Sequence, residues 1–66
     1  MKIKEIRELT DNELRERVLT EKDALLRMSL SHAITQLDNP SQITETRRTI
    51  ARIETEIRAR EIKQQQ

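Results

Sequence analysis

The sequence predicts an all-α protein, an antiparallel hairpin of two long helices that follows a short N-terminal helix. The 66-residue chain contains no glycine, no aromatic residue and one proline, whereas ordinary globular domains contain about 7% glycine. Apolar residues recur at helical spacing, and two capping signals mark helix starts. We expect a single domain over residues 1–66. A core of this size contributes no more than about 3–5 kcal/mol to the stability of the fold, so we expect the domain to need a binding partner.

The short helix is expected over about residues 2–8. Apolar residues at every third position give it a one-sided strip, made of Ile3, Ile6 and Leu9. Thr10 then has the features of a helix N-cap, because Glu13 stands three residues later at the spacing of a capping box. A long helix over about residues 11–37 is predicted to follow.

Two apolar stripes run along this long helix. The first stripe comprises Leu14, Val18, Leu25 and Met28. The second stripe comprises Leu19, Leu26, Leu30, Ala33 and Leu37. One stripe is sufficient for a two-helix hairpin, so the second stripe predicts another neighbour, either the short helix or a separate protein surface.

A turn is expected at residues 38–40, and the second long helix over about residues 40–62. Asn39 as N-cap, Pro40 at the first helical position and Gln42 at the third make another capping box. A heptad seam should pack antiparallel against the preceding helix, and it consists of Ile43, Ile50, Ile53 and Ile57.

Thr46 is the polar exception in this seam. If its hydroxyl is buried without a good partner, replacement by valine should stabilise the hairpin by about 1 kcal/mol. The glutamine-rich residues 63–66 have no apolar side chain to bury and are expected to fray.

The sequence provides no set of residues for catalysis or metal binding. It has no cysteine, and His32 is its only histidine, so neither a thiolate nor a histidine cluster is available. We predict no enzymatic activity, no cofactor, no metal and no small-molecule substrate. Most charged residues fit a solvated surface with i,i+4 ion pairs, such as Glu54 with Arg58 and Glu56 with Arg60.

The sequence shows no pattern of a signal peptide or of a membrane span. The opening residues are charged, and no window approaches the roughly 20 apolar residues of a membrane span. A cytoplasmic protein without membrane contact is therefore expected.

Charge is distributed unevenly although the net charge is only +1. Residues 10–38 carry four bases and six acids, whereas residues 39–66 carry six bases and four acids. The second half is thus the better candidate for a phosphate-binding surface.

Arg47, Arg48 and Arg52 are the strongest candidates for RNA contact, because Arg48 and Arg52 lie one helical turn apart on the face opposite the isoleucine seam. Arg27 could reach either RNA or a carboxylate of the other helix, and its spacing leaves both open. The absence of aromatic residues argues against base stacking on aromatic rings, so we expect a structured RNA recognised through phosphates and shape.

The chain resembles a known family, the large-subunit ribosomal protein numbered twenty-nine, over nearly its whole length. The signature of that family is matched by Asn39-Pro40, Ile43 and the run from Arg47 to Ile53, and its opening by Met1-Lys2 and the Thr10 cap. Thr46 departs from the pattern, which prefers a bulky apolar or aromatic residue there.

The resemblance implies a structural protein that binds ribosomal RNA of the large subunit near the exit of the nascent-chain tunnel. The RNA-facing residues implied are Arg27, Asn39, Arg47, Arg48 and Arg52. Ribosomal protein number twenty-three is the implied neighbour, and chaperones or targeting factors dock nearby. The second apolar stripe, from Leu19 to Leu37, is the candidate surface for such protein contacts.

A different class of protein fits the same pattern. Two copies of the hairpin could bury both apolar stripes in a four-helix bundle, which would act as a protein-interaction module. The mass in solution would distinguish a compact dimer that ignores RNA from a weakly folded monomer.

Overall fold

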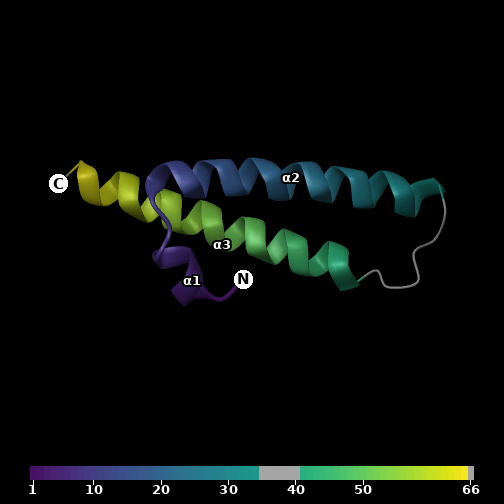
Figure 1. The fold of residues 1–66 in the computed structure, drawn as a ribbon, viewed down its shortest axis with the longest axis horizontal. Helices are drawn as coiled ribbons and strands as arrows, with labels where there is room; N and C mark the ends of the chain where they lie inside the picture. The colour runs from purple at the N-terminus through teal and green to yellow at the C-terminus, as the bar shows by residue number, and fades with distance from the viewer. Residues whose placement is uncertain (35–40, 66) are drawn as a thin grey trace.

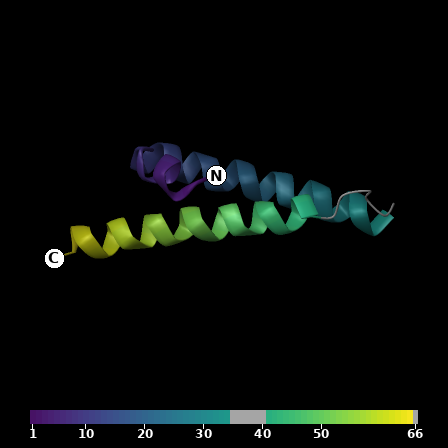
Figure 2. The same cartoon turned by 90° about the horizontal axis from the view of Figure 1, so that it is seen from below.

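The computed structural model describes residues 1–34 and 41–65, and it confirms the all-α class. It contains α1 (Ile3–Arg7), α2 (Asp11–Ile34) and α3 (Ser41–Gln64), and no strand occurs in the described ranges. In both views α2 and α3 lie side by side and run in opposite directions, while α1 packs against α3 (Figure 1, Figure 2). Within the described part of the chain, no helix is long and apolar enough to cross a membrane.

The start of α2 is determined by the predicted capping box. The backbone N–H of Glu13 donates to Thr10 Oγ1 at 3.2 Å, and the Thr10 N–H donates to Glu13 Oε1 at 3.1 Å. Two backbone donors that have no partner within the helix are thereby satisfied. This cap separates α2 from the five-residue α1, whose own N-cap residue Lys2 makes no side-chain hydrogen bond.

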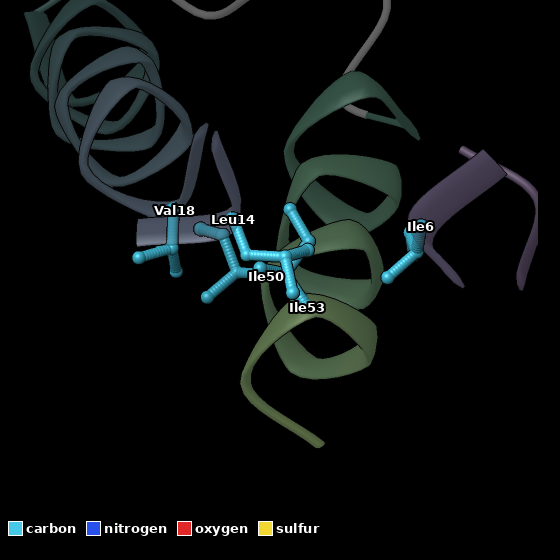
Figure 3. Close-up of a cluster of buried hydrophobic side chains, with 5 residues drawn as sticks. All are labelled: Ile6, Leu14, Val18, Ile50 and Ile53. Atoms are coloured by element: carbon cyan, nitrogen blue, oxygen red, sulfur yellow. The ribbon is translucent and has the colours of Figure 1, made fainter. Parts of the chain in front are cut away.

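The core lies where all three helices meet. Among the described residues, five apolar side chains are buried, and they are Ile6, Leu14, Val18, Ile50 and Ile53. Figure 3 shows Ile6 reaching α3 from one side, while the α2 residues meet the α3 isoleucines from the other. The first stripe of α2, through Leu14, Val18 and Leu25, and the heptad seam of α3, through Ile50, Ile53 and Ile57, are therefore confirmed as packing surfaces.

This core is small for the size of the molecule. The chain extends over 48 × 18 × 15 Å, and an elongated shape leaves most of its surface in water. The partly buried residues around the core are Met1, Leu9, Leu25 and Ile57. Burial is concentrated near α1, so the hairpin has little apolar burial to stabilise it farther along.

The carboxyl end of the chain differs from the expectation. The helix continues to Gln64 instead of ending near residue 62, and the Gln65 N–H still donates to the Glu61 carbonyl at 3.2 Å. Gln64 Nε2 also donates to Asp11 Oδ2 of α2 at 3.3 Å, and the fraying expected for residues 63–66 stays a prediction. The predicted turn at 38–40 and the last predicted turn of α2 lie outside the described residues.

Thr46 also corrects an expectation. The residue is half-buried, and its hydroxyl donates to the Gln42 carbonyl one turn earlier, at 2.8 Å, in an exposed hydrogen bond. The premise of a poorly satisfied buried hydroxyl was wrong, because a threonine in a helix can bond the carbonyl four residues back.

Candidate nucleic-acid interface

The side of α3 that faces away from the core carries a set of exposed residues that we call the outer face. At about 100° per residue, these residues fall within one arc opposite Ile53. The outer face consists of Thr44, Arg47, Arg48, Ala51, Thr55, Arg58 and Ile62. None of them is acidic, although the helix as a whole contains four glutamates.

The arginines of the outer face are not neutralised within the molecule. Among the described residues, the side chains of Arg47, Arg48 and Arg58 have no ion pair or hydrogen bond. A guanidinium is permanently charged and offers five N–H donors in a planar fork that matches a phosphate. This surface can therefore bind phosphates without first breaking an internal contact.

Arg58 was missed by the sequence reasoning, which paired it with Glu54. Glu54 instead forms an ion pair with Lys22 of α2, with Nζ and Oε1 2.8 Å apart. Only tertiary packing brings Lys22 to that position. A signal was nevertheless present in the sequence, since Arg58 follows Arg47 by eleven residues, close to three full helical turns.

Arg52 has a more local role than expected. Its Nη1 donates to the Met1 carbonyl at 3.0 Å, and the Met1 amino group donates to Thr49 Oγ1 at 3.4 Å. Arg52 thus lies at the border between α3 and the segment that leads into α1. One Nη1 donor is engaged, and the other N–H groups of the guanidinium remain available.

Arg27 is not brought together with the α3 arginines. It lies on α2, two residues after the partly buried Leu25 and so about 200° around the helix from it. Its Nη2 pairs with Asp23 Oδ2 at 3.0 Å, on a side chain that is 79% exposed. This carboxylate belongs to the same helix and not to the other helix, as the sequence had left open, and the possible contact of Arg27 with RNA stays a prediction. Asn39 lies outside the described residues.

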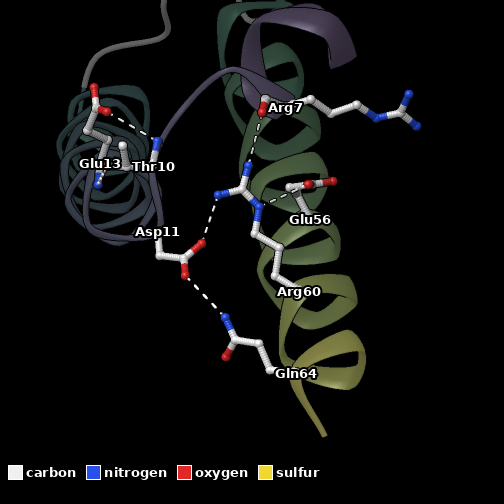
Figure 4. Close-up of polar contacts among 7 residues, drawn as sticks. All are labelled: Arg7, Thr10, Asp11, Glu13, Glu56, Arg60 and Gln64. Carbon is white, nitrogen blue, oxygen red and sulfur yellow. Dashed lines mark hydrogen bonds and ion pairs between the residues drawn. The ribbon is translucent and has the colours of Figure 1, made fainter. Parts of the chain in front are cut away.

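Arg60 looks like a further surface arginine in the sequence but is engaged internally. Its Nη1 binds Asp11 Oδ1 at 2.8 Å, its Nε binds Glu56 Oε1 at 3.1 Å, and its Nη2 donates to the Arg7 carbonyl at 3.1 Å (Figure 4). The predicted pair of Glu56 with Arg60 is confirmed. The additional partners join the ends of α1 and α2 to α3.

The contacts where Arg60 joins α1 and α2 to α3, which we call the junction, shift the pKa values of Asp11 and Arg60. The hydrogen bond from Arg60 lowers the pKa of Asp11, and the same bond raises the pKa of Arg60. The backbone N–H of Thr10, followed by its side chain, lowers the pKa of Glu13. Hydrogen bonds to the charged form of a carboxylate favour that form, so folding favours the ionised form of both acids.

The second stripe of α2 is exposed, so α1 does not cover it. Leu19, Leu26 and Leu30 are 67%, 58% and 56% exposed, and Ala33 is exposed as well. Ile34, which the sequence reasoning did not include, continues this apolar surface. Leu37 lies outside the described residues. A contiguous apolar surface in water is typical of a protein contact site.

A small core, an arginine face without acids and an uncovered apolar stripe define a class of protein, a small helical component that functions by binding within an assembly. The sequence model of the family described as Ribosomal L29 protein matches residues 4–60. The chain belongs to the ribosomal L29 protein family.

Its relatives carry the name large ribosomal subunit protein uL29. The protein of Carboxydothermus hydrogenoformans is 54% identical over 65 residues, which are 98% of this chain and 94% of the relative. The proteins of Desulforudis audaxviator and Bacteroides thetaiotaomicron are each 52% identical over 62 residues, 94% of this chain, and the match covers 92% and 95% of them. No solved structure matched.

Family membership confirms several predictions made from the sequence. The chain is a structural protein of the large ribosomal subunit, it is not an enzyme, and its location is the cytoplasmic ribosome. The recognised resemblance is thereby confirmed over nearly the whole chain. The individual RNA-binding residues stay predictions.

Proposed function

We propose that the chain binds large-subunit ribosomal RNA through the outer face of α3, near the exit of the nascent-chain tunnel. The observation that carries the proposal is the set of three exposed arginines, Arg47, Arg48 and Arg58, that have no internal partner among residues 1–34 and 41–65. Such side chains release counterions from the RNA when they bind phosphates, which favours association.

The form of this surface favours structured RNA. Ala51 and Thr55 lie between the arginines and are small, so a sugar–phosphate backbone can approach the helix closely. The chain has no aromatic residue on which successive bases could stack. Recognition by phosphate contacts and shape follows, as is usual for double-stranded RNA.

Sedimentation of lysates tests this proposal. A tagged chain should sediment with the large subunit through a sucrose gradient after a high-salt wash, and the double variant Arg47→Gln, Arg48→Gln should be lost at lower salt. The matched control is Arg15→Gln, Arg17→Gln on α2, which removes the same charge. Equal retention of both double variants would contradict an RNA contact through α3.

We further propose that the exposed stripe of α2 contacts a neighbouring ribosomal protein, the one numbered twenty-three, close to where chaperones or targeting factors dock. Its support is the exposure of Leu19, Leu26 and Leu30, which no part of the described chain covers. In the competing four-helix bundle the same stripe would form the dimer interface.

Charge substitution in the stripe distinguishes these possibilities. The double variant Leu26→Asp, Leu30→Asp should reduce cross-linking to protein twenty-three within the subunit, whereas Thr20→Asp, Ser31→Asp on another side of α2 should not. Sedimentation equilibrium of the isolated chain should give a monomer. A dimer that the leucine substitutions dissociate would instead support the self-associating bundle.

A further inference from the structure

A groove of about 250 Å³ lies between α1 and α3. Its apolar wall is formed by Ile3 and Ile6 of α1 and by Ala51 of α3. Ile6 is almost completely buried, at 2% exposure, whereas Ile3 is 54% exposed. The groove therefore leaves part of the Ile3 side chain in water where α1 meets α3.

The rim of this groove is cationic. Arg7 and Arg52 both line it, together with Thr55 and one acid, Glu56. Glu56 is already bound to Arg60 Nε at 3.1 Å, so its charge is balanced. The Arg7 side chain extends away from the Arg60 contacts, which engage only its carbonyl (Figure 4). Two cations beside an apolar wall favour an anionic occupant that has an apolar part.

Arg52 is held in position at this rim. Its bond to the Met1 carbonyl, 3.0 Å long, restricts the guanidinium before any ligand arrives. A guanidinium plane can stack on a nucleobase, and its free N–H groups can also bind a phosphate. Restriction in the unbound protein reduces the entropy lost on binding.

The groove is continuous with the proposed RNA-binding surface. Ala51 and Thr55 line the groove and also belong to the outer face of α3. A phosphate backbone bound by the arginines of the outer face would pass the mouth of the groove. The volume is below the roughly 300–1,000 Å³ of sites for drug-sized ligands, which suits a single flat ring system.

We propose that this groove receives one unpaired nucleobase of the large-subunit ribosomal RNA. The base lies against Ile3 and Ala51, Arg52 stacks on or beside it, and Arg7 binds a flanking phosphate. The proposal deepens, and rests on, the proposed RNA contact through α3. It differs from recognition by aromatic stacking, because an aliphatic wall and a guanidinium take the place of aromatic rings.

Chemical probing of base edges in purified large subunits tests the proposal. In subunits that contain the natural chain, one unpaired base should be protected. Ile3→Ser removes the apolar wall and Ala51→Leu fills the groove, and neither changes the charge. Each should raise the reactivity of the same base about fourfold or more, the change in binding expected when one buried methylene group loses its contact.

Two control variants introduce serine and leucine elsewhere. Thr20→Ser and Ser31→Leu change exposed residues of α2 that lie outside the groove and outside the apolar stripe, and they should leave the protected base unchanged. Unchanged base reactivity in both groove variants, with the chain still bound to the subunit, would overturn the groove proposal while RNA binding through α3 stands. If the natural chain protects no RNA nucleotide at all, the proposed RNA contact fails as well.

A photo-reactive amino acid in place of Ile3 identifies the occupant directly. A cross-link to ribosomal RNA supports the proposal. A cross-link to another protein, with none to RNA, would overturn it in favour of a peptide occupant.

Discussion

Arg60 near the end of α3 binds Asp11 at the start of α2, with Nη1 and Oδ1 2.8 Å apart. The two residues are 49 positions apart in the chain. The same guanidinium also forms an ion pair with Glu56 and donates to the Arg7 carbonyl. One side chain therefore joins all three helices, at the end of the hairpin where the core lies.

Loss of this junction should lower the thermal stability. We expect Arg60→Ala to reduce the Tm more than Arg58→Ala, because Arg60 is bound to Asp11 and Glu56 whereas Arg58 has no partner in the described chain. Circular dichroism at 222 nm during heating measures both variants. Equal Tm values would mean that the Arg60 contacts contribute nothing to the folded state.

The small core makes the hairpin sensitive to a single cavity. Ile53 is completely buried, at 0% exposure, and replacing such a residue by alanine costs about 2–5 kcal/mol. A core of this size contributes about 3–5 kcal/mol in total, so Ile53→Ala should largely unfold the isolated chain. Circular dichroism should show the loss of helix, while Ile34→Ala, at an 85% exposed position, should retain it.

Stability should fall in acid. The folded state lowers the pKa of Asp11 and of Glu13 below their ordinary values of 3.8 and 4.5. The folded state therefore binds fewer protons than the unfolded state in this range, and its stability decreases as the pH falls through and below those values. Above about pH 6 the titration of these two carboxyl groups should not change the stability further.

Melting temperatures measured between pH 7 and pH 3 test this expectation. The double variant Asp11→Asn, Glu13→Gln should lose less Tm over that range than the natural chain, because the linked protonations are removed. Parallel curves for the two proteins would assign the acid sensitivity to other carboxylates.

Thr46→Val should have little effect, in contrast to the stabilisation expected from the sequence. The hydroxyl already has the Gln42 carbonyl as a partner at 2.8 Å, so its removal relieves no unsatisfied group. We expect the free energy of unfolding to change by less than about 0.5 kcal/mol. Urea titration measures it, and a stabilisation near 1 kcal/mol would restore the original expectation.

Arg58 should contribute to RNA affinity in a salt-dependent way. Removal of one phosphate contact reduces the slope of log affinity against log salt concentration by about 0.9 for a duplex. We expect this reduction for Arg58→Gln in filter binding to large-subunit ribosomal RNA. Arg17→Gln, whose side chain pairs with Glu21 at 2.9 Å, is the matched control and should leave the slope unchanged.

Much of the fold could be predicted because its signals are local. The capping box of Thr10 and Glu13 involves residues three positions apart, and the stripes that contain Leu14 and Ile53 follow from helical periodicity. The isoleucine spacing likewise indicated which side of α3 would be buried. Local hydrogen bonding and apolar periodicity were thus sufficient for the helices, their approximate starts and the hairpin.

The sequence by itself determined the helices and the presence of an arginine-rich side on α3. The tertiary structure decided which charges remain available. It pairs Lys22 with Glu54, so that Arg58 has no partner in the part of the chain that the structure describes, and it engages Arg60 with Asp11. The physical reason is that ion pairs between helices depend on the relative rotation and register of those helices. Apolar packing fixes that rotation and register only in the folded chain.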